Sequence, residues 1–511
     1  MSSIVRCFKG SRVALLLAII CLSCSEDAAA PRAAPADRSA ASHLSVSKIS
    51  LHEPNTLEKY RMITFDLDWE NNYRTSSSAD NWDAVWVFVK YMAGDGDWKH
   101  ATLSTVSAEH HSPPGSSISA PSDGKGVFVR QSDIEAEDFH APGVSLRWNY
   151  GLDDVADDAA LRVKVFGLEM VHIPEGGFFA GDGQSDASLT KGSNDFRPWH
   201  ITSEDAIVVT NTASNGYYYR SSKDVWNDVW NAHEDVTGAS FTIPADYPKG
   251  YRAIYCMKYE MTERQYVDFL NTTTGAQASN RYDGANFNKF GYTISRRNDV
   301  YSTANPDRAC GFINPADAFA FADWSALRPM TELEFEKICR GSGNPYVPGE
   351  YAWGTTKCIN AVEATGTESD RQYMTESGAN SYFLEDDFMP QFPLNVGIFT
   401  APGKTREQCG AAYHGVMEMS TNLSETCVSI GDMNGRAFTY RNGDGRLSTD
   451  GYADESNWPL RDGKGSGYRG GTLAQEKGHM CVSVRVEATV AIAADHRHIP
   501  WGFRGVRTVS F

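Results

Sequence analysis

The sequence predicts an α+β protein in which an all-β sandwich precedes a larger region with few helices and long irregular loops. Segments that alternate apolar and polar side chains are confined to residues 46–167, and readable helix starts occur only after residue 168. At about 150 residues per domain, the 511 residues form roughly two to four domains. An aromatic content of 12% excludes wholesale disorder.

The charge balance narrows the range of partners. The chain has 47 Lys and Arg residues against 65 Asp and Glu residues, a formal net charge of −18. Because so acidic a surface repels phosphate backbones, no nucleic-acid partner is expected. After the N-terminal leader, the sequence contains no apolar run of about 20 residues that would span a bilayer. We therefore expect any membrane contact to be made through the N-terminus alone.

The first 24 residues resemble the export signal of a bacterial lipoprotein. Basic residues precede the apolar run 13–20, which is too short to span a membrane. Cys24 follows a small residue, as lipoprotein cleavage requires, and is the candidate for lipidation. Cys21 departs from the pattern, because an aliphatic residue usually stands three places before the lipidated cysteine.

Localisation follows from this leader. Residues 25–45 are rich in Ala, Pro and Ser and predict a flexible tether. We expect an exported lipoprotein of the outer membrane or cell surface, attached to the membrane only through a lipid at Cys24. Cleavage after the alanines at 28–30 is the alternative, and it would release a soluble periplasmic protein.

Residues 46–167 are expected to form a β-sandwich domain. Apolar and polar side chains alternate through 63–69, as in a half-buried strand, whereas 83–90 is apolar on both faces and predicts a central strand. Two further alternating segments are 144–150 and 161–165. Four tryptophans either line a sugar-stacking face or pack in the sandwich, and packing is favoured: Trp69, Trp82, Trp86 and Trp98.

Residues 168–511 contain three helix starts. Thr262 and Thr331 each begin a capping box, and Asn314 precedes a first-turn proline. The surrounding chain is irregular and rich in Gly, Asn and Asp. A hydrophobic core alone does not hold long loops in one conformation. Bound calcium is a natural candidate for the additional constraint.

Seven short motifs occur in order along this region. They are 170–178 (MVHIPEGGF), 258–263 (KYEMTE), 328–336 (RPMTELEFE), 351–354 (YAWG), 415–422 (GVMEMSTN), 469–471 (RGG) and 502–504 (GFR). This series resembles the formylglycine-generating enzyme (sulfatase-modifying factor) family along the whole of 168–511. The resemblance implies a variant C-type-lectin-like fold with little regular secondary structure. The family includes copper-dependent oxidases that convert a sulfatase cysteine to formylglycine, and exported relatives without that activity, some of them lipoprotein parts of secretion and gliding machinery.

The resemblance implies a copper(I) site made of two cysteines five residues apart. Cys481 matches the second cysteine, but Glu476 stands five residues earlier, or Gln475 in an ungapped count, and neither is a soft ligand. Ser424 and Thr472 replace the family's pocket tryptophan and serine. Cys481 is thus the sole catalytic candidate, and copper is not expected.

The resemblance also implies two calcium sites with oxygen ligands. The first combines the side chains of Glu418 and Glu425 with the carbonyls of Thr421 and Leu423. The second combines the side chains of Asn360 and Asp386 with the carbonyls of Ala361 and Phe388. The alternative for Glu418 and Glu425 is that they are solvated surface charges.

Other motifs carry weaker signals. His496 and His498 are interpreted as surface residues rather than metal ligands, and 442–445 as a turn rather than a calcium loop. Seven cysteines follow the leader region without a CxxC motif, and an odd number leaves at least one unpaired in a monomer.

Three functions remain open from the sequence. The leading expectation is a non-catalytic, calcium-stabilised binding or structural lipoprotein of the bacterial envelope, whose partner is a glycan or an envelope protein. The first alternative is a copper-dependent oxidase that generates formylglycine with Cys481 as its only thiolate. The second is a variable lectin-fold receptor whose binding face lies in 481–504.

Overall fold

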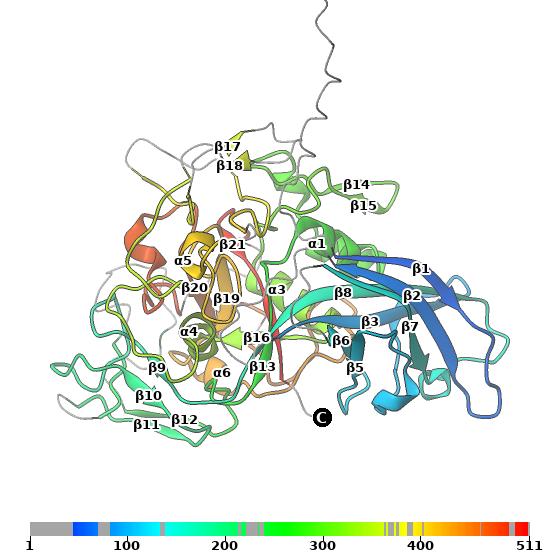
Figure 1. The fold of residues 1–511 in the computed structure, drawn as a ribbon, viewed down its shortest axis with the longest axis horizontal. Coiled ribbons are helices and arrows are strands. Elements are labelled where there is room, and N and C mark those ends of the chain that lie inside the picture. The colour runs from blue at the N-terminus through cyan, green and yellow to red at the C-terminus, as the bar shows by residue number, and fades with distance from the viewer. Residues whose placement is uncertain are drawn as a thin grey trace, which may run out of the picture. The chain divides into compact units, whose positions relative to one another are not determined.

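A computed structural model describes residues 44–69, 82–132, 138–212, 216–220, 234, 240–361, 364–365, 373–374, 378–385, 392–400, 403–459, 461–489 and 496–508 (Figure 1). The predicted signal segment, Cys24 and nearly all of the tether lie outside these residues, as do Asp386 and Phe388. The described residues belong to one compact unit, Ser39–Phe511. Within the described ranges, no helix has the length and hydropathy needed to cross a bilayer.

Strands dominate the first half of the chain. They are β1 (Ser45–Leu51), β2 (Arg61–Trp69), β3 (Asp83–Ala93), β4 (Lys99–His100), β5 (Ser116–Ser119), β6 (Val127–Gln131), β7 (Phe139–Trp148), β8 (Leu161–Ile173), β9 (Phe178–Ala180), β10 (Trp199–Ile201), β11 (Ile207–Val209), β12 (Phe241–Ile243) and β13 (Ile254–Met257). Short 3₁₀ turns occupy Ser107–Glu109 and Tyr150–Asp153.

The second half combines short helices with short strands. The helices are α1 (Glu263–Leu270), α2 (Gly275–Arg281), α3 (Pro315–Trp324), α4 (Glu332–Arg340), α5 (Arg406–Cys409) and α6 (Met433–Arg436). The strands are β14 (Ser295–Arg297), β15 (Val300–Ser302), β16 (Arg328–Thr331), β17 (Ala364–Thr365), β18 (Tyr373–Met374), β19 (Ser424–Val428), β20 (Ser466–Arg469), β21 (Trp501–Gly502) and β22 (Gly505–Thr508). Two more 3₁₀ turns lie at Gly284–Asn286 and Lys477–Met480.

The N-terminal region consists of antiparallel sheets, in agreement with the predicted all-β character. One layer is the antiparallel sheet β1-β2-β7, and the other is formed by β3, β6, β5 and the first part of β8. The alternating residues Ile63, Phe65 and Leu67 are all completely buried in the core between the layers. Alternation in the sequence therefore identified the inner face of β2 correctly.

Strand β3 is central, as its two apolar faces predict. Val85 and Val87 face the sandwich core, whereas Trp86 and Phe88 face a second and larger core that contains the helices α1 and α3. The indole of Trp86 donates a hydrogen bond of 2.9 Å to the carbonyl of Ser325 at the end of α3. Strand β3 of the sandwich thus forms one wall of the larger core that contains α1 and α3.

A single sheet runs through both regions. Its strand order is β20-β19-β16-β22-β13-β8-β3-β6-β5, and β8 pairs along its length with β3 and at its end with β13. The boundary that the sequence predicts at 167/168 falls inside β8. Gly167 lies at this position because a Cβ there would approach Val85 Cγ1 to 3.0 Å and Leu44 Cδ2 to 3.2 Å.

All three predicted helix caps are present. Thr262, Asn314 and Thr331 each accept a hydrogen bond from the third residue of their helix and form complete capping boxes. Capping boxes at Thr274 and Thr405, which begin α2 and α5, were not predicted from the sequence. Those helices have seven and four residues, too short for a clear apolar periodicity.

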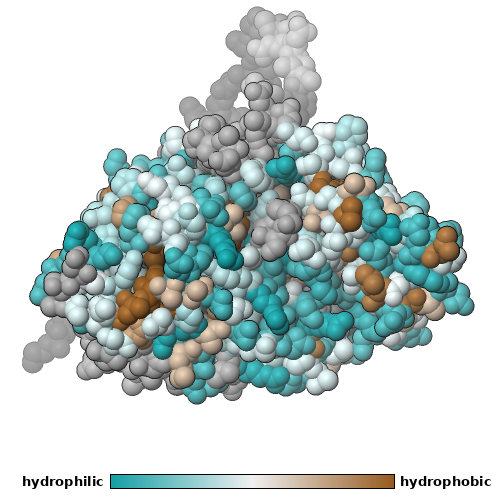
Figure 2. All heavy atoms as spheres, turned by 90° about the horizontal axis from the view of Figure 1, so that it is seen from below, coloured by the Kyte–Doolittle hydropathy of each residue, from teal (hydrophilic) through white to brown (hydrophobic). Residues whose placement is uncertain are grey.

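Most of the four tryptophans pack against other side chains, in agreement with the interpretation that was favoured over a sugar-stacking face. Trp69 and Trp86 are 1% and 0% exposed. Trp82 stacks on His172 at 4.1 Å, and the half-exposed ring of Trp98 lies 5.1 Å from the ammonium of Lys164. The face seen in Figure 2 is mostly hydrophilic, with hydrophobic side chains gathered in separate patches.

Candidate functional site

The first predicted calcium loop lies between Gly415 and β19, and its two carboxylates are buried. Glu418 and Glu425 are 2% and 0% exposed, which rules out the alternative that they are solvated surface charges. Glu418 and Asn422 adopt left-handed φ angles of 57° and 69°. Such a backbone costs of order 1–3 kcal/mol for a non-glycine residue, and so the surrounding structure must hold this loop in place.

Each of these carboxylates uses only one of its two oxygens. Glu418 Oε1 accepts a hydrogen bond from the Gly397 amide at 3.0 Å, and Glu425 Oε1 accepts one from Arg504 Nε at 2.9 Å. The Oε2 atoms of both residues are buried and have no hydrogen-bond partner among the described residues. The carbonyls of Thr421 and Leu423 likewise accept no hydrogen bond within the described ranges. Four oxygens of the predicted site therefore have no hydrogen-bond partner within the described ranges.

A third buried carboxylate, Glu260, was missed by the sequence reasoning. Its Oε1 accepts a hydrogen bond from the Leu423 amide at 2.8 Å, and its Oε2 accepts one from Asn422 Nδ2 at 2.5 Å. The motif 258–263 contains this residue, but nothing in the motif indicates which distant loop it contacts. We call Glu260, Glu418 and Glu425 the carboxylate site.

The electrostatics of the carboxylate site are unfavourable without a further cation. Burial raises the pKa of Glu418 to about 7 and that of Glu425 to about 8, although Arg504 opposes both shifts. Burial and the two neighbouring carboxylates raise the pKa of Glu260 well above its ordinary value. A bound divalent cation would reverse these shifts by stabilising the ionised carboxylates.

Gly470 places the motif 469–471 beside this site. It has a φ of 81°, and a Cβ there would lie 2.8 Å from the Met419 carbonyl oxygen and 2.9 Å from Glu425 Oε2. Only glycine therefore allows the backbone to approach Glu425 so closely.

The second predicted calcium site is described only in part. Asn360 is buried, its Nδ2 donates to the Phe383 carbonyl at 3.0 Å and to Glu385 Oε2 at 3.2 Å, and its Oδ1 accepts from the Phe383 amide at 3.1 Å. The Ala361 amide donates to the Ser381 carbonyl. Because Asp386 and Phe388 lie outside the described residues, this site stays a prediction.

Cys481 lies in a different environment. Its thiol is half-buried and donates to the Gly349 carbonyl at 3.4 Å. Burial raises its pKa to about 12, and Asp182 and Cys358 add to the rise. Gln475 donates to Glu487 instead, and Glu476 is exposed before the 3₁₀ turn Lys477–Met480. Gln475, Glu476 and Cys481 therefore do not provide the pair of thiols, five positions apart, that the family's copper site needs.

A second thiol nevertheless lies nearby. Cys358 and Cys481 are the half-exposed members of the seven described cysteines, and both pack against one cluster: Tyr351, Trp353, Phe383 and Met480. The Cys358 thiol donates to Tyr351 Oη at 3.7 Å. Sequence spacing gave no signal of this proximity, because it arises only when distant loops pack together. We call Cys358 and Cys481 the thiol site.

The other altered pocket positions are closed to solvent. Ser424 is 0% exposed and pairs with Trp501 in the parallel register of β19 and β21. Thr472 is 1% exposed and accepts a hydrogen bond from the Ala474 amide. Trp501 in turn stacks on Tyr468 at 4.7 Å.

The weaker motifs are also accounted for. His496 and His498 are exposed, in agreement with the prediction, and their rings pack near Trp501. The turn at 442–445 brings Asp444 next to Asp323 and Asp454. The Asp323 carboxylate accepts hydrogen bonds from the backbone amides of both at 3.0 Å, which explains this acidic cluster as a loop brace.

The fold agrees with the comparison to known families. The profile of the sulfatase-modifying factor enzyme 1-like domain matches residues 232–509, more than half of the chain, and the protein therefore belongs to this family. Among curated proteins, no similar sequence was found. The family match begins after β8–β11, so the sandwich and the strands that follow it precede the matched region.

Proposed function

We propose that this protein is a non-catalytic, calcium-stabilised binding or structural module of the bacterial envelope, built on a sulfatase-modifying factor domain. One observation carries the proposal: the buried Oε2 atoms of Glu418 and Glu425 have no hydrogen-bond partner among the described residues. Removing an ionised carboxylate from water costs several kcal/mol unless a cation compensates it. Arg504 forms an ion pair with Glu425, and no such pair with Glu418 occurs among the described residues.

Calcium suits this donor set better than other common cations. It takes six to eight oxygen ligands from carboxylates and carbonyls in a flexible geometry. Glu418 and Glu425 would hold it together with the carbonyls of Thr421 and Leu423. The bound ion would supply charge compensation that fixes the loop, and Glu260 would position that loop through Leu423 and Asn422.

The non-catalytic part of the proposal rests on the thiol chemistry. Copper(I) prefers soft thiolate ligands, and at the family position five residues before Cys481 stands an exposed carboxylate. With its pKa raised to about 12, Cys481 is a neutral thiol at physiological pH.

The envelope location is proposed from the leader. A lipid at Cys24 would attach the protein to the outer membrane or cell surface, and cleavage after 28–30 would release it into the periplasm instead. The proposed partner is a glycan or an envelope protein.

Metal analysis combined with thermal unfolding tests the calcium proposal on residues 25–511. We expect about one calcium ion at the carboxylate site after gel filtration, and a higher melting temperature with calcium than after removal of divalent ions, because a ligand of the native state stabilises it by mass action. Glu418→Gln should reduce this gain, and Glu53→Gln, at an exposed position, should not. A metal-free protein with an unchanged melting curve would refute the proposal.

A second candidate is the copper-dependent oxidase, and the packing of Cys358 beside Cys481 favours it. To test it, the protein is incubated with copper(I), oxygen and a cysteine-containing sulfatase-type peptide, and the peptide is followed by mass spectrometry. Conversion to the aldehyde that Cys481→Ala abolishes would replace the leading proposal. No conversion, beside an active family member as positive control, would exclude the oxidase.

A further inference from the structure

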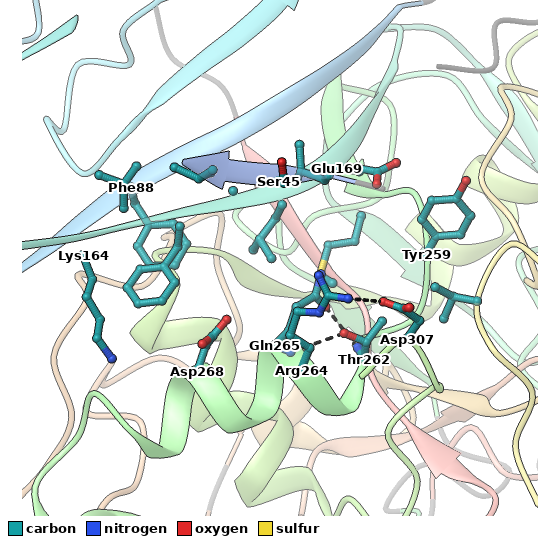
Figure 3. A pocket seen from close by; sticks show the side chains of 18 of the residues that line it. Ser45, Phe88, Lys164, Glu169, Tyr259, Thr262, Arg264, Gln265, Asp268 and Asp307 are labelled. Carbon is teal, nitrogen blue, oxygen red and sulfur yellow. Dashed lines mark hydrogen bonds and ion pairs between the residues drawn. The ribbon is translucent and has the colours of Figure 1, made fainter. Parts of the chain in front are cut away.

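A cavity of about 380 Å³ separates the sandwich from the first helix of the family domain (Figure 3). Its walls come from the start of β1, from β8 and from one side of α1. None of its lining residues belongs to the carboxylate site or the thiol site. Its volume lies at the lower end of the range for small-molecule pockets, about 300–1,000 Å³.

One side of the cavity is apolar. Phe88 and Trp324 form its base together with Met257, and all three are almost completely buried. Val46 and Ile49 of β1 add a half-buried and an exposed apolar side chain at the edge.

The opposite side has polar groups that the protein leaves unsatisfied. In Figure 3, Lys164 extends from β8 toward α1, and Asp268 extends from α1 toward the sheet. Neither side chain has a hydrogen bond or an ion pair within the described part of the chain. Gln265 uses its carbonyl oxygen to accept from the Thr262 amide at 3.0 Å, which leaves its NH₂ group free to donate.

The remaining charged residues that line the cavity are Arg264, Asp307 and Glu169, and Glu169 is almost completely buried with an interaction partner of its own. Arg264 pairs with Asp307 at 2.6 Å, so this cation and this anion compensate one another. The formal charges of Lys164 and Asp268 likewise sum to zero. A ligand with a net charge would leave one of these two groups uncompensated, whereas a neutral ligand with both donors and acceptors would serve both.

We infer that this cavity binds a neutral polyhydroxylated ring, a saccharide unit of one or two sugars. A carboxylate only accepts hydrogen bonds and an ammonium only donates them, and a sugar hydroxyl does both. A sugar ring also has an apolar face of C–H groups, which matches the apolar side of the cavity. Asp268 and Lys164 would contact the hydroxyls, and Gln265 would donate to a third oxygen.

This inference rests on the proposed binding role and adds the place and the ligand class. It is independent of calcium, since the cavity uses none of the proposed calcium ligands. A failure here therefore leaves the calcium proposal standing, and the reverse also holds.

Saccharide titration of residues 25–511, followed by calorimetry and saturation-transfer NMR, tests the inference. The probes are glucose, galactose, mannose and N-acetylglucosamine with their β-linked disaccharides, and the controls are the zwitterions leucine and phenylalanine. We expect at least one saccharide to bind, and Asp268→Ala and Lys164→Met each to weaken it about tenfold, the effect of losing a hydrogen bond to a charged group. Asp246→Ala, at an exposed position outside the cavity, is the matched control.

Three outcomes would overturn the inference. They are no saccharide binding at about 10 mM, a weak affinity by the usual scale; binding that both cavity variants leave unchanged while remaining folded by circular dichroism; and preferential binding of a zwitterion, which would reassign the cavity to amino acids or peptide ends.

Discussion

The carboxylate site and the thiol site lie in the same family domain and both are largely removed from water, yet their burial carries different information. Two carboxylate oxygens are buried without a partner among the described residues, whereas the Cys481 thiol has a carbonyl partner. A buried carboxylate is costly unless it is compensated, while a buried thiol behaves as a small hydrophobic group. The unpaired carboxylate oxygens are therefore the basis for the proposed calcium site, and a half-buried cysteine alone would not support such a proposal.

The largest expected effect comes from removing Arg504, the only cation that pairs with Glu425 among the described residues. Arg504 is completely buried and also donates to the carbonyls of Lys258 and Met417. Arg504→Met should destabilise the calcium-free protein by about 3–5 kcal/mol, because it leaves a buried charge unpaired. Urea unfolding with and without calcium measures this loss, and calcium should recover part of it. Arg461→Met, at an exposed ion pair, should cost less than about 1 kcal/mol.

Calcium should stabilise the wild-type protein by a smaller amount. At a concentration 100 times its dissociation constant, the expected gain is about 2.7 kcal/mol. Glu418→Gln should remove most of this gain and should leave the calcium-free protein about as stable as wild type, because a neutral amide costs less to bury. Equal gains in both proteins, measured by urea unfolding, would place calcium elsewhere.

The pH dependence sharpens the comparison further. Burial raises the folded-state pKa of Glu418 to about 7 and that of Glu425 to about 8, from the ordinary value of 4.5. These groups therefore contribute stability below about pH 4.5, and the contribution is lost as the pH rises through 7 to 8. Melting curves of the calcium-free protein between pH 5 and 9 should show this decline, calcium should flatten it, and calcium affinity should rise with pH. A calcium-free protein that gains stability over this range would contradict the assignment.

The smallest effect is expected at the thiol site. Cys481→Ala removes a half-buried thiol and should cost no more than about 1 kcal/mol, with the calcium gain unchanged. Cys427→Ala is the matched control in the core, where the side chain is 1% exposed and a larger loss is expected. If Cys481→Ala abolished a bound metal or the calcium gain, the distinction between the two sites would fail.

Local patterns were sufficient for much of the fold. The alternation at 63–69 identified the inner face of β2, and the capping residues Thr262, Asn314 and Thr331 identified the helix starts. These signals are readable because they depend on neighbours within four residues along the chain. The short helices α2 and α5 were not predicted, because one or two helical turns are too short to show an apolar periodicity.

The candidate sites were predictable only where a motif contains several ligands. The family resemblance implied a common site for Glu418 and Glu425, because both stand at ligand positions of one motif. Glu260 and Cys358 were missed, since Glu260 meets Leu423, and Cys358 lies near Cys481, across more than 100 residues of chain. The continuity of one sheet through β8, which pairs with β3 and with β13 of the matched region, was likewise invisible, because strand pairing is a non-local property.

The sequence by itself determined the family, the strand and helix character of the two regions, and which cysteine of the family pair is absent. Composition, periodicity and the order of motifs are properties of the sequence and do not depend on the tertiary structure. Only the tertiary structure decided that Glu418 and Glu425 are buried with unpaired oxygens, that Cys358 packs beside Cys481, and that Lys164 faces a cavity with Asp268. Burial and proximity are created by packing between distant segments. Packing therefore sets the free energy of burying a charged group and decides which groups can contact a ligand.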